Sequence, residues 1–531
     1  MGLGFCGFLV LGAYGWKATL EGAGVRAGWD TVLENTVQLA TGGVAIVVSE
    51  KFDEHWTLKA AKWGVKAVLA AALIQSILIV FHRQIRQLLF RRTRGHEVYA
   101  GLGLHNADLA LAACARGARV SVVSANPDHP IRGKLEESGG LFVAGCPTDT
   151  QKLKAAGAGK AARVVAASED GDNGTIEIAE AVSSMERSGG CGMGEILACI
   201  ESADARELLN RKWKLVAAPG AWRARTIGFE AAAMRNLVAD AALALSRIPR
   251  ALESGPCLLV AAEDPFARAF LRAAIPFLQI SGSAVPKFFV AVDDPREEVE
   301  FRMLYPDVDL VANVVFVETP DRMVPFHQAF FGCRFDLAVV HLKEEASTLQ
   351  LSGKILSSPR FAAAGVHAVT MHRPSTQLLE TPGLKVCSIF EMGIQSPEFG
   401  ELSLEEEARD NHAAYLAGLQ DAERVKAKSY DDLSEAHKES NRWAVLHRRI
   451  KRELWSSAAG AGTPQFLEQL AICEHQRWMG EKIIQGWTFG EKRDDGRLLH
   501  PDIRSYSDLS PETKEKDRVQ VRKALGLSPN H

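Results

Sequence analysis

The stretch "VYAGLGLHNADLA", residues 98–110, decides how the central part of this chain folds. An apolar run leads into Gly101 and Gly103 and then into a helical pattern. A strand, a glycine turn and a helix in this order place a helix N-terminus where it attracts an anion. Asn106 stands where the third glycine of Gly-x-Gly-x-x-Gly belongs. The stretch therefore predicts a strand–turn–helix unit and leaves open whether that unit binds a nucleotide.

Strands and helices alternate on both sides of this turn. The first series of strand patterns is "HEVYAGLG", "RVSVVS", "GLFVAG", "RVVAAS" and "GEILACIES", and a second begins near 256 with "CLLVAAE", "KFFVAVDD", "VVFVET", "FDLAVVHL" and "GVHAVTMHR". Such alternation indicates an α/β fold with parallel strands and right-handed crossovers. We predict two tandem doubly wound Rossmann-like domains, at 96–250 and 251–400. The second has "AAEDPF" where its glycine turn should be, which favours a structural role.

Residues 1–95 have the composition of a membrane anchor. Residues 1–16 and 67–81 carry no charge, and the second run reaches spanning length, about 60–82, if Lys62 and Lys66 extend to the interface. The arginines that follow it are Arg83, Arg86, Arg91, Arg92 and Arg94. Arginines after a span mark the cytoplasmic side. We predict a short transmembrane helical anchor of two spans, an arginine-rich linker, and an interfacial or re-entrant segment between the spans.

Composition narrows the classes of function. The chain has 531 residues, a net charge of −3 and 24% charged residues, so nothing in it indicates a nucleic-acid partner. Its nine cysteines form no Cys-x-x-Cys pair, and no metal site is predicted. Neither Rossmann-like domain contains a recognisable catalytic set, so the chain is predicted to be a binding protein and not an enzyme.

Residues 401–531 are predicted to form an all-α domain that contains an internal repeat. "SYDDLSEAHKESNR" at 429–442 and "SYSDLSPETKEKDR" at 505–518 share eight of fourteen residues at an offset of 76. Ser434 and Ser510 are predicted helix N-caps, with Pro511 at the first helical position. The second copy has an additional loop, "GWTFGEKRDDGRLLHP". We therefore expect a pseudo-duplicated helical domain with one asymmetric feature.

These motifs resemble known families. "GLGLHNADLA", "GCPTDTQKLKAAGAGKAARVVAASEDGDN" and "GEILACIESADARELL" resemble the TrkA-N domain, the regulator-of-potassium-conductance (RCK) fold. The C-terminal repeats resemble the ryanodine-receptor (RyR) domain. A membrane anchor, tandem RCK-like domains and a RyR domain resemble an architecture of bacterial membrane proteins. The resemblance implies a regulatory ligand at the glycine turn and a homo-oligomer, a dimer or a tetramer.

The RCK-like ligand site departs from the family at several positions. The candidate residues are Gly101, Gly103, Asn106, Ser124 and Asp149. Ser124 stands where the resemblance implies an acidic residue that grips the ribose, and Cys146 replaces an aspartate. Gly101 and Gly103 keep the tight turn. The cofactor is therefore unknown: a nucleotide remains open, and conventional NAD binding through the ribose is disfavoured.

A second candidate site lies in the second RyR-like copy, where its additional loop breaks the symmetry. The candidate residues are His475, Arg477, Trp478, Trp487, Arg493 and Asp494. Aromatic faces beside arginines suit a flat base that carries a phosphate. The alternative reading is structural, because His412 and His475, like Tyr430 and Tyr506, occupy matched positions and fit buried core residues.

Together these observations predict a ligand sensor in the bacterial inner membrane, with most of the chain in the cytoplasm. Its partners would be the lipid bilayer and a small ligand, a nucleotide or nucleotide-derived messenger, whose binding is coupled to a membrane effector or ion flux. One alternative is a potassium channel or transport regulator, although a potassium filter needs a "TVGYG"-like segment and the chain offers only "TGG" at 41–43. Another alternative is a ligand-free membrane scaffold.

Overall fold

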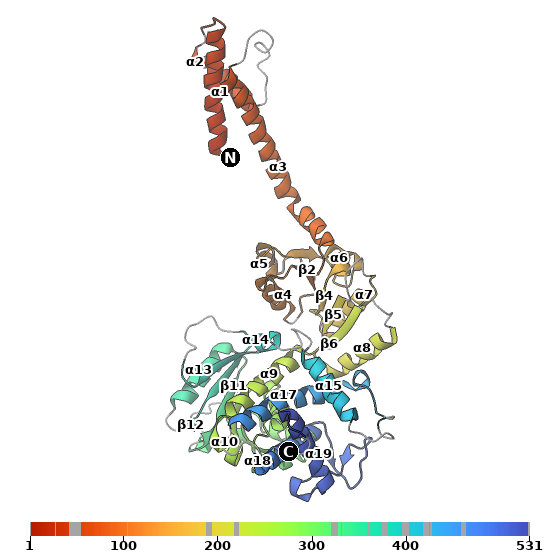
Figure 1. Cartoon of the computed structure of the whole chain (residues 1–531). Helices are drawn as coiled ribbons and strands as arrows, with labels where there is room; N and C mark the ends of the chain where they lie inside the picture. The colour runs from red at the N-terminus through yellow and green to blue at the C-terminus, as the bar shows by residue number, and fades with distance from the viewer. Residues whose placement is uncertain are drawn as a thin grey trace. The chain divides into compact units, whose positions relative to one another are not determined.

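The structure, a computed structural model, divides the chain into two compact units. One unit is Met1–Thr93 with Lys154–Gly157, and the other is the remainder of the chain (Figure 1). The residues described are 2–26, 28–41, 55–103, 105–186, 194–216, 222–319, 328–330, 332–358, 362–372, 381–395, 403–417, 424, 427–457 and 463–528. Each unit is considered by itself below.

The N-terminal unit is a group of three helices. These are α1 (Gly2–Gly22), α2 (Trp29–Thr41) and α3 (Trp56–Arg92). Helix α1 packs on α3 at Gly15, where a Cβ would lie 2.5 Å from the backbone nitrogen of Leu58. Any larger residue at Gly15 would therefore push the two helices apart. Trp16, Val32 and Leu58 form the small core of this unit.

One stretch of the described residues, Trp56–Ile77 in α3, is long and apolar enough to cross a membrane by length and composition. It covers most of the predicted second span. The predicted first span lies in α1, which does not meet the same criterion. The segment predicted as an arginine-rich linker continues α3 as far as Arg92. The predicted "TGG" segment lies outside the described residues beyond Thr41.

The first α/β domain has a six-stranded parallel sheet. Its elements are β1 (Glu97–Ala100), α4 (Asn106–Ala115), β2 (Val120–Ser124), α5 (Ile131–Glu137), β3 (Leu141–Ala144), α6 (Thr150–Ala155), η1 (Ala158–Lys160), β4 (Arg163–Ala166), α7 (Asp172–Ser183), β5 (Gly194–Cys199), α8 (Ala203–Val216) and β6 (Trp222–Ile227). The strand order is β3-β2-β1-β4-β5-β6, with every pair parallel. This is the predicted doubly wound arrangement, and the glycine turn follows its central strand β1.

The second α/β domain repeats this topology. Helices α9 (Phe229–Leu245) and α10 (Pro249–Ser254) lead into β7 (Cys257–Ala262), α11 (Phe266–Phe277), β8 (Lys287–Val292), α12 (Arg296–Leu304), η2 (Val308–Leu310), β9 (Asn313–Glu318), η5 (Gln328–Phe330), β10 (Arg334–Phe335), β11 (Leu337–His341), α13 (Glu345–Ser357), β12 (Ala362–Ala363), β13 (Val366–Thr370), β14 (Leu384–Ser388) and α14 (Ile389–Ile394). The main sheet has the order β14-β13-β11-β7-β8-β9. Counted along the chain, this is the order of the first sheet.

The last strand of each sheet, β6 and β14, was missed by the sequence analysis. Their sequences, "WRARTI" and "LKVCS", lack the continuous apolar run of a strand buried on both faces. Both are edge strands, so much of each side-chain row is only partly buried. Periodicity alone identifies such strands poorly.

The C-terminal region is helical, as predicted, apart from two short strands in the additional loop. Its elements are α15 (Ser403–Ala417), η7 (Tyr430–Asp432), α17 (Glu435–Ser457), α18 (Pro464–Ile484), β15 (Thr488–Phe489), β16 (Leu499–His500), η8 (Tyr506–Asp508) and α19 (Pro511–Leu525). Both predicted N-caps are confirmed. The Ser510 hydroxyl accepts a bond from the Thr513 backbone N–H, and Ser434 accepts one from that of His437.

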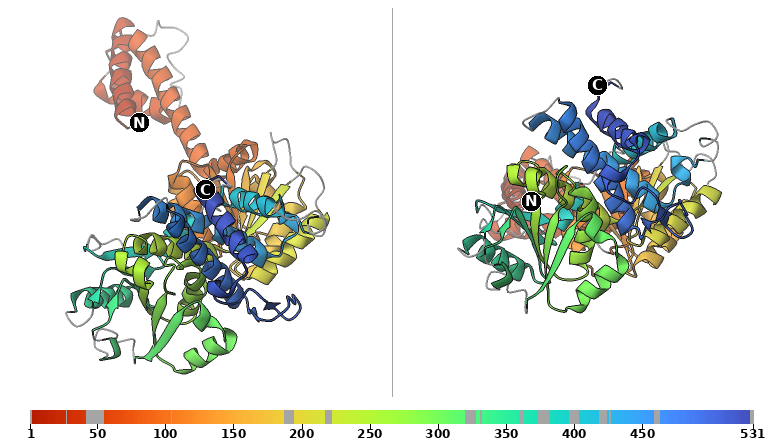
Figure 2. Two further views of the ribbon diagram at one scale, coloured as in Figure 1. Left: turned by 60° about the horizontal axis from the view of Figure 1, so that its bottom comes forward. Right: turned by 90° about the horizontal axis from the view of Figure 1, so that it is seen from below.

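The C-terminal helices pack on the second α/β domain and share its core. Helix α18 lies along α11 and α17 lies along α9; Figure 2 shows the blue helices against the green sheet. Phe277 of α11, for example, contacts Trp443 and His447 of α17, with ring centroids 5.0 and 5.2 Å away. The second sheet and the C-terminal helices therefore form one continuous hydrophobic core.

Candidate functional site

The glycine turn of the first domain is tightly closed. Gly101 has a φ of +80°, which favours glycine. At Gly103 an added Cβ would lie 1.7 Å from the backbone oxygen of Ser168, in the loop after β4. The two predicted glycines are therefore required by close backbone approach within the protein, whether or not a ligand binds.

Asn106, the departure from the fingerprint, has a structural role at the turn. Its side chain is fully buried, and its Nδ2 donates to the carbonyl oxygen of Gly101 at 2.7 Å and more weakly to that of Val165 at 3.4 Å. The amide thus ties the start of α4 to the end of β1 and to β4. This replaces the close helix–strand packing that a third glycine provides.

Aromatic side chains lie at the N-terminus of α4. The His105 ring, directly before the helix, stacks on Phe229 with a centroid distance of 4.2 Å and lies 5.9 Å from Phe390 of α14. Burial lowers the pKa of His105, which favours its neutral form. In Rossmann folds this helix end faces the pyrophosphate, and here it faces an apolar contact with α9 and α14.

The other two predicted residues of this site make local contacts. The buried Ser124 hydroxyl accepts a bond from the backbone N–H of Asn126 at 3.2 Å. Asp149 is exposed, and its Oδ1 accepts a bond from the backbone N–H of Gln151 at the start of α6. Nucleotide binding at the glycine turn stays a prediction.

The two C-terminal repeats contain the same hydrogen-bond network. In the first copy, Glu405 accepts from the Tyr430 hydroxyl at 3.0 Å and from Arg442 Nε at 2.8 Å. In the second copy, Tyr506 and Arg518 donate to Glu468 at 3.1 and 2.6 Å.

The paired histidines also repeat. Nε2 of His412 and Nε2 of His475 each lie 2.9 Å from a backbone carbonyl oxygen, that of Lys428 and that of Arg504 respectively. Both histidines and both paired tyrosines are buried. All four are therefore core residues, and a ligand role for His475 stays a prediction.

Arg477, predicted as a ligand residue, lies inside the helical core. Its guanidinium bonds Glu474 at 3.1 Å and Glu481 at 2.8 Å, and all three side chains are buried. Lys451 forms a further ion pair with Glu474. Burial opposes the charge on Arg477, but the two carboxylates outweigh it and raise the pKa of the guanidinium. Arg477 thus binds its own protein's carboxylates.

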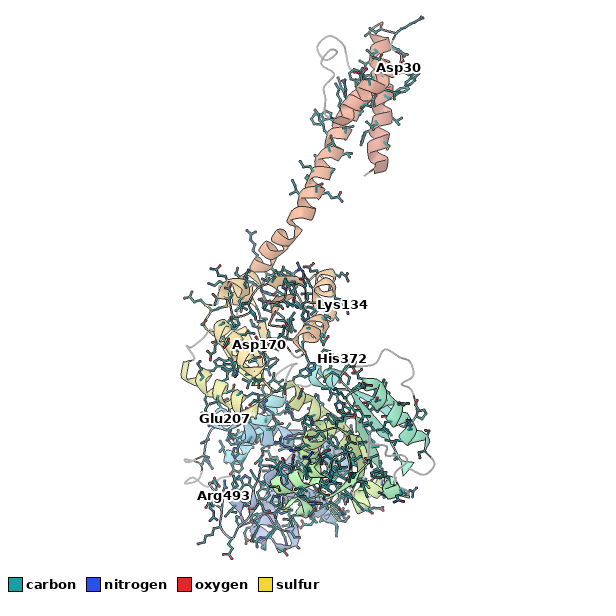
Figure 3. The ribbon with its side chains drawn as sticks, turned by 180° about the vertical axis from the view of Figure 1, so that it is seen from behind. Asp30, Lys134, Asp170, Glu207, His372 and Arg493 are labelled. Atoms are coloured by element: carbon teal, nitrogen blue, oxygen red, sulfur yellow. The ribbon has the colours of Figure 1, made fainter. Side chains whose placement is uncertain are left out.

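The remaining residues of that predicted site only partly come together. Trp478 and Trp487 flank His500, whose ring lies 4.9 Å from Trp478 and 6.1 Å from Trp487. His475 contacts the other residues of this group only through Trp478, with ring centroids 5.8 Å apart. Arg493 lies at the periphery of the C-terminal region (Figure 3) and pairs with Asp495 at 2.7 Å. Asp494 accepts bonds from the backbone N–H groups of its own turn. Ligand binding here stays a prediction.

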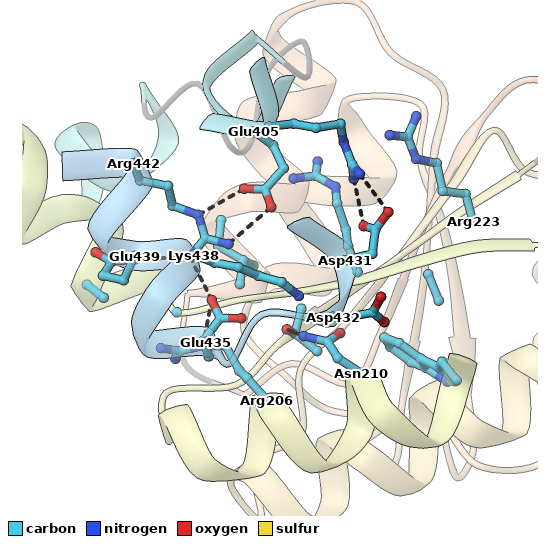
Figure 4. Close-up of a pocket in the computed structure, with 18 of the residues that line it drawn as sticks. Arg206, Asn210, Arg223, Glu405, Asp431, Asp432, Glu435, Lys438, Glu439 and Arg442 are labelled. Atoms are coloured by element: carbon cyan, nitrogen blue, oxygen red, sulfur yellow. Dashed lines mark hydrogen bonds and ion pairs between the residues drawn. The ribbon is translucent and has the colours of Figure 1, made fainter. Parts of the chain in front are cut away.

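A cavity of about 710 Å³ lies between the first α/β domain and the first C-terminal repeat. Helix α8 and strand β6 line one side, the start of α9 lies beneath, and α15, η7 and α17 line the other side. Figure 4 shows Arg206 and Asn210 of α8 facing Glu435, Lys438 and Arg442 of α17. Residues more than 200 positions apart in sequence thus form one site.

The cavity walls are strongly charged, with an excess of cations. Seven cationic side chains line it, namely Arg206, Arg223, Arg225, Arg235, Arg409, Lys438 and Arg442, against five carboxylates, namely Glu405, Asp431, Asp432, Glu435 and Glu439. Arg225 is also paired with Glu195, which lies outside the lining. A formal excess of one positive charge therefore faces the cavity.

Ion pairs join α17 to α9 and to α8, where Arg206 lies 4.0 Å from Glu435. Arg235 of α9 pairs with Glu439 of α17 at 2.5 Å, and Arg442 joins Glu435 and Glu439 at 2.6 and 3.0 Å. Burial opposes ionisation of Glu439, yet Arg235 and Arg442 lower its pKa to about 2. The carboxylate is therefore charged at neutral pH and joins α17 to α9.

Some donors of the cavity have no partner among the described residues. Arg223 of β6 is exposed and forms neither a hydrogen bond nor an ion pair there. The Nη2 of Arg225 and the indole Nε1 of Trp213 are buried without a hydrogen-bond partner. Buried donors without an acceptor are costly, so an acceptor-rich ligand would be favoured in this cavity.

The sequence analysis missed this site because its walls meet only in the folded chain. The repeat at 429–442 ends at Arg442, but the repeat alone gave that residue no role. Trp213, Trp222 and Arg223 lie on α8 and on the unpredicted edge strand β6. The matched position of Arg409 in the second copy, at the offset of 63 that relates His412 to His475, is the apolar Ile472. This difference between the two copies is the sequence feature that could have pointed to Arg409 as a residue of the cavity.

The fold and the site define a class: two tandem Rossmann-like domains joined to a duplicated helical domain, with a cavity between domains. Residues 461–527, the second copy, match the RyR domain family. A structure of the GsuK channel bound to NAD is 14% identical over 79% of this chain and 86% of that chain, with a TM-score of 0.42. GsuK bound to ADP is 17% identical over 75% and 97%, with a TM-score of 0.39.

Proposed function

We propose that this chain is a membrane-anchored ligand sensor, and that the cavity between the first α/β domain and the first C-terminal repeat binds its ligand. The observation that carries the proposal is the excess of cations in a cavity built jointly by two domains. Its volume of about 710 Å³ lies within the usual range for small-molecule sites, about 300–1,000 Å³. A ligand there would contact both walls and alter how they pack.

The chemistry of the walls favours a nucleotide or a nucleotide-derived messenger. Arg223 and Lys438 offer charge to phosphates, and Trp213 and Trp222 offer aromatic surface to a base. Asp431 and Asp432 lie on the opposite wall and offer acceptors for sugar hydroxyls. The glycine turn offers fewer polar groups to a phosphate, because aromatic side chains meet at the helix N-terminus that follows it.

Membrane attachment is part of the proposal. The stretch Trp56–Ile77 has the length and composition of a span, and Leu73, Ile74 and Ile77 are exposed on it. Exposed apolar side chains on a helix of this length suit contact with lipid. The arginines at the end of α3 favour a cytoplasmic position for the rest of the chain.

The test is ligand-dependent stabilisation of the purified full chain in detergent. The panel is ATP, ADP, NAD, NADH, ADP-ribose, and linear and cyclic dinucleotides. A ligand at 100 times its Kd stabilises the folded state by about 2.7 kcal/mol. We expect Arg223→Ala to abolish the shift and Arg272→Ala, an exposed arginine of α11, to leave it unchanged.

Three outcomes would either place the ligand at another site or refute ligand binding. A shift that survives Arg223→Ala but not Trp487→Ala would place the ligand in the second repeat. A shift lost only in Gly103→Asp would return it to the glycine turn and favour a potassium-transport regulator, provided that the variant unfolds in the same cooperative transition as the wild type, because a Cβ at Gly103 meets the Ser168 backbone. No shift with any member of the panel would refute ligand sensing and favour a scaffold. Ion flux through proteoliposomes, with and without ligand, then tests the membrane effector.

A further inference from the structure

Three potential metal ligands of different types meet between α9 and the second sheet. They are Asp240 of α9, His367 of β13 and Cys387 of β14. Cys387 is paired with Val369, two residues after His367, so the His367 and Cys387 side chains lie on the same face of the sheet. One carboxylate oxygen, one imidazole nitrogen and the thiol sulfur lie within 4.8 Å of one another.

The two sheet residues of the cluster are buried, Asp240 is partly exposed, and two polar atoms of the cluster lack a partner among the described residues. His367 is 4% exposed and Cys387 1% exposed. Neither Asp240 Oδ2 nor His367 Nδ1 has a hydrogen-bond partner among the described residues. His367 Nε2 lies 3.8 Å from Asp240 Oδ2, which is too long for a hydrogen bond. Buried polar atoms left in this way cost about 1–3 kcal/mol each, so an ion between them would be stabilising.

Burial keeps both sheet residues neutral in the metal-free protein. It lowers the pKa of His367 to about 4, so the imidazole is neutral at pH 7 and has a lone pair to offer. Burial also raises the pKa of Cys387 to about 12. The Asp240 carboxylate is balanced by Lys385, whose Nζ lies 2.5 Å from Oδ1 and whose side chain is half exposed. Oδ2 faces the cluster.

We propose that Asp240, His367 and Cys387 bind a divalent transition-metal ion of the zinc class. Thiolate, imidazole and carboxylate are the ligands that Zn²⁺ prefers, with bonds of about 2.0–2.3 Å. A nitrogen and an oxygen ligand of a tetrahedral ion, at bonds of about 2.0–2.1 Å, are about 3.3–3.4 Å apart, so the 3.8 Å between His367 Nε2 and Asp240 Oδ2 has to shorten by about 0.4–0.5 Å. The fourth position is left to water.

Metal binding requires one proton to leave. The Cys387 Sγ–H bond breaks, the sulfur forms a bond to the metal, and the proton goes to solvent. Lys385 competes with the ion for the carboxylate of Asp240. The site connects α9, which follows the last strand of the first sheet, to the edge of the second sheet. A bound ion would therefore brace the junction of the two α/β domains.

The test is a titration of the metal-free full chain in detergent with Co²⁺, followed by displacement with Zn²⁺. We expect one Co²⁺ per chain and a thiolate-to-cobalt charge-transfer band. Cys387→Ser removes the band and His367→Gln weakens binding at least tenfold. Cys146→Ser, which alters an exposed thiol elsewhere, retains the band. Thermal unfolding of the metal-free variants shows that they are folded.

Lys385→Ala separates a built site from accidental binding. Removal of its ammonium frees Asp240, so the variant is expected to bind Co²⁺ more tightly than the wild type. Because one proton is released, affinity should rise about tenfold per pH unit below the thiol pKa. Absence of the charge-transfer band in the wild type, its survival in Cys387→Ser, or weaker binding in Lys385→Ala would each overturn the proposal.

Discussion

Replacement of Arg477 by methionine tests whether this residue serves the fold or a ligand. Its guanidinium bonds Glu474 and Glu481 in the helical core. After the substitution Glu474 keeps its ion pair with Lys451. Glu481 keeps only a hydrogen bond from Gln485 among the described residues. Loss of one partner of a buried pair costs about 3–5 kcal/mol, and we expect about 3 kcal/mol because one of the two carboxylates remains paired.

The assay is equilibrium unfolding in urea, followed by tryptophan fluorescence. Four tryptophans, Trp443, Trp455, Trp478 and Trp487, lie in the C-terminal helical region and report on it. The double variant Arg477→Met/Glu481→Gln removes both charges and should regain most of the lost stability. Arg493→Met, which breaks an exposed pair with Asp495, should cost less than about 1 kcal/mol.

A stability deficit of Arg477→Met below about 1 kcal/mol, or one that the double variant fails to reduce, would refute a structural role for Arg477. Ligand-induced stabilisation that persists in the double variant would exclude Arg477 from the ligand site.

Two further predictions concern the first α/β domain. Asn106→Gly restores the glycine fingerprint but removes the bond to the Gly101 carbonyl. We therefore expect thermal unfolding to show a loss of stability of about 1–3 kcal/mol, with no gain in nucleotide affinity. Increased stability would contradict the role assigned to this amide. Burial and then Glu230 raise the pKa of Glu201 to about 7, above the value near about 4.3 in an unfolded chain. The raised pKa of Glu201 contributes up to about 3 kcal/mol to the stability of the folded protein. This contribution is fully present below the unfolded-chain pKa of about 4.3 and is lost as the pH rises through about 7. The Tm of the wild type should therefore fall more between about pH 5 and pH 8 than that of Glu201→Gln, and equal slopes would be inconsistent with this reasoning.

The sequence by itself determined the architecture. Apolar strands that alternate with helices predicted two parallel sheets, because crossovers between parallel strands need a helix. The repeat at an offset of 76 predicted two equivalent helical copies, and the Tyr430–Glu405 and Tyr506–Glu468 bonds recur accordingly. The hydroxyl of a serine directly before a helix accepts a hydrogen bond from a backbone N–H group three residues later. Because this interaction is local, Ser434 and Ser510 were identified correctly as helix N-caps.

Only the tertiary structure decided which polar residues face one another. Arg477 and Trp478 are neighbours in sequence, yet the first bonds two buried carboxylates and the second packs on His500. Helix periodicity does not show which of two polar neighbours meets a partner. The bond between Arg235 and Glu439 likewise joins residues 204 positions apart.

The interdomain cavity and the Asp240–His367–Cys387 cluster have the same origin. Each is assembled from elements that are far apart along the chain and that meet because hydrophobic burial packs α9, the second sheet and the C-terminal helices into one core. Local sequence patterns determine strands, helices and caps, since these depend on neighbours within a few residues. Sites formed across packed faces depend on the relative placement of whole elements, which no local pattern contains.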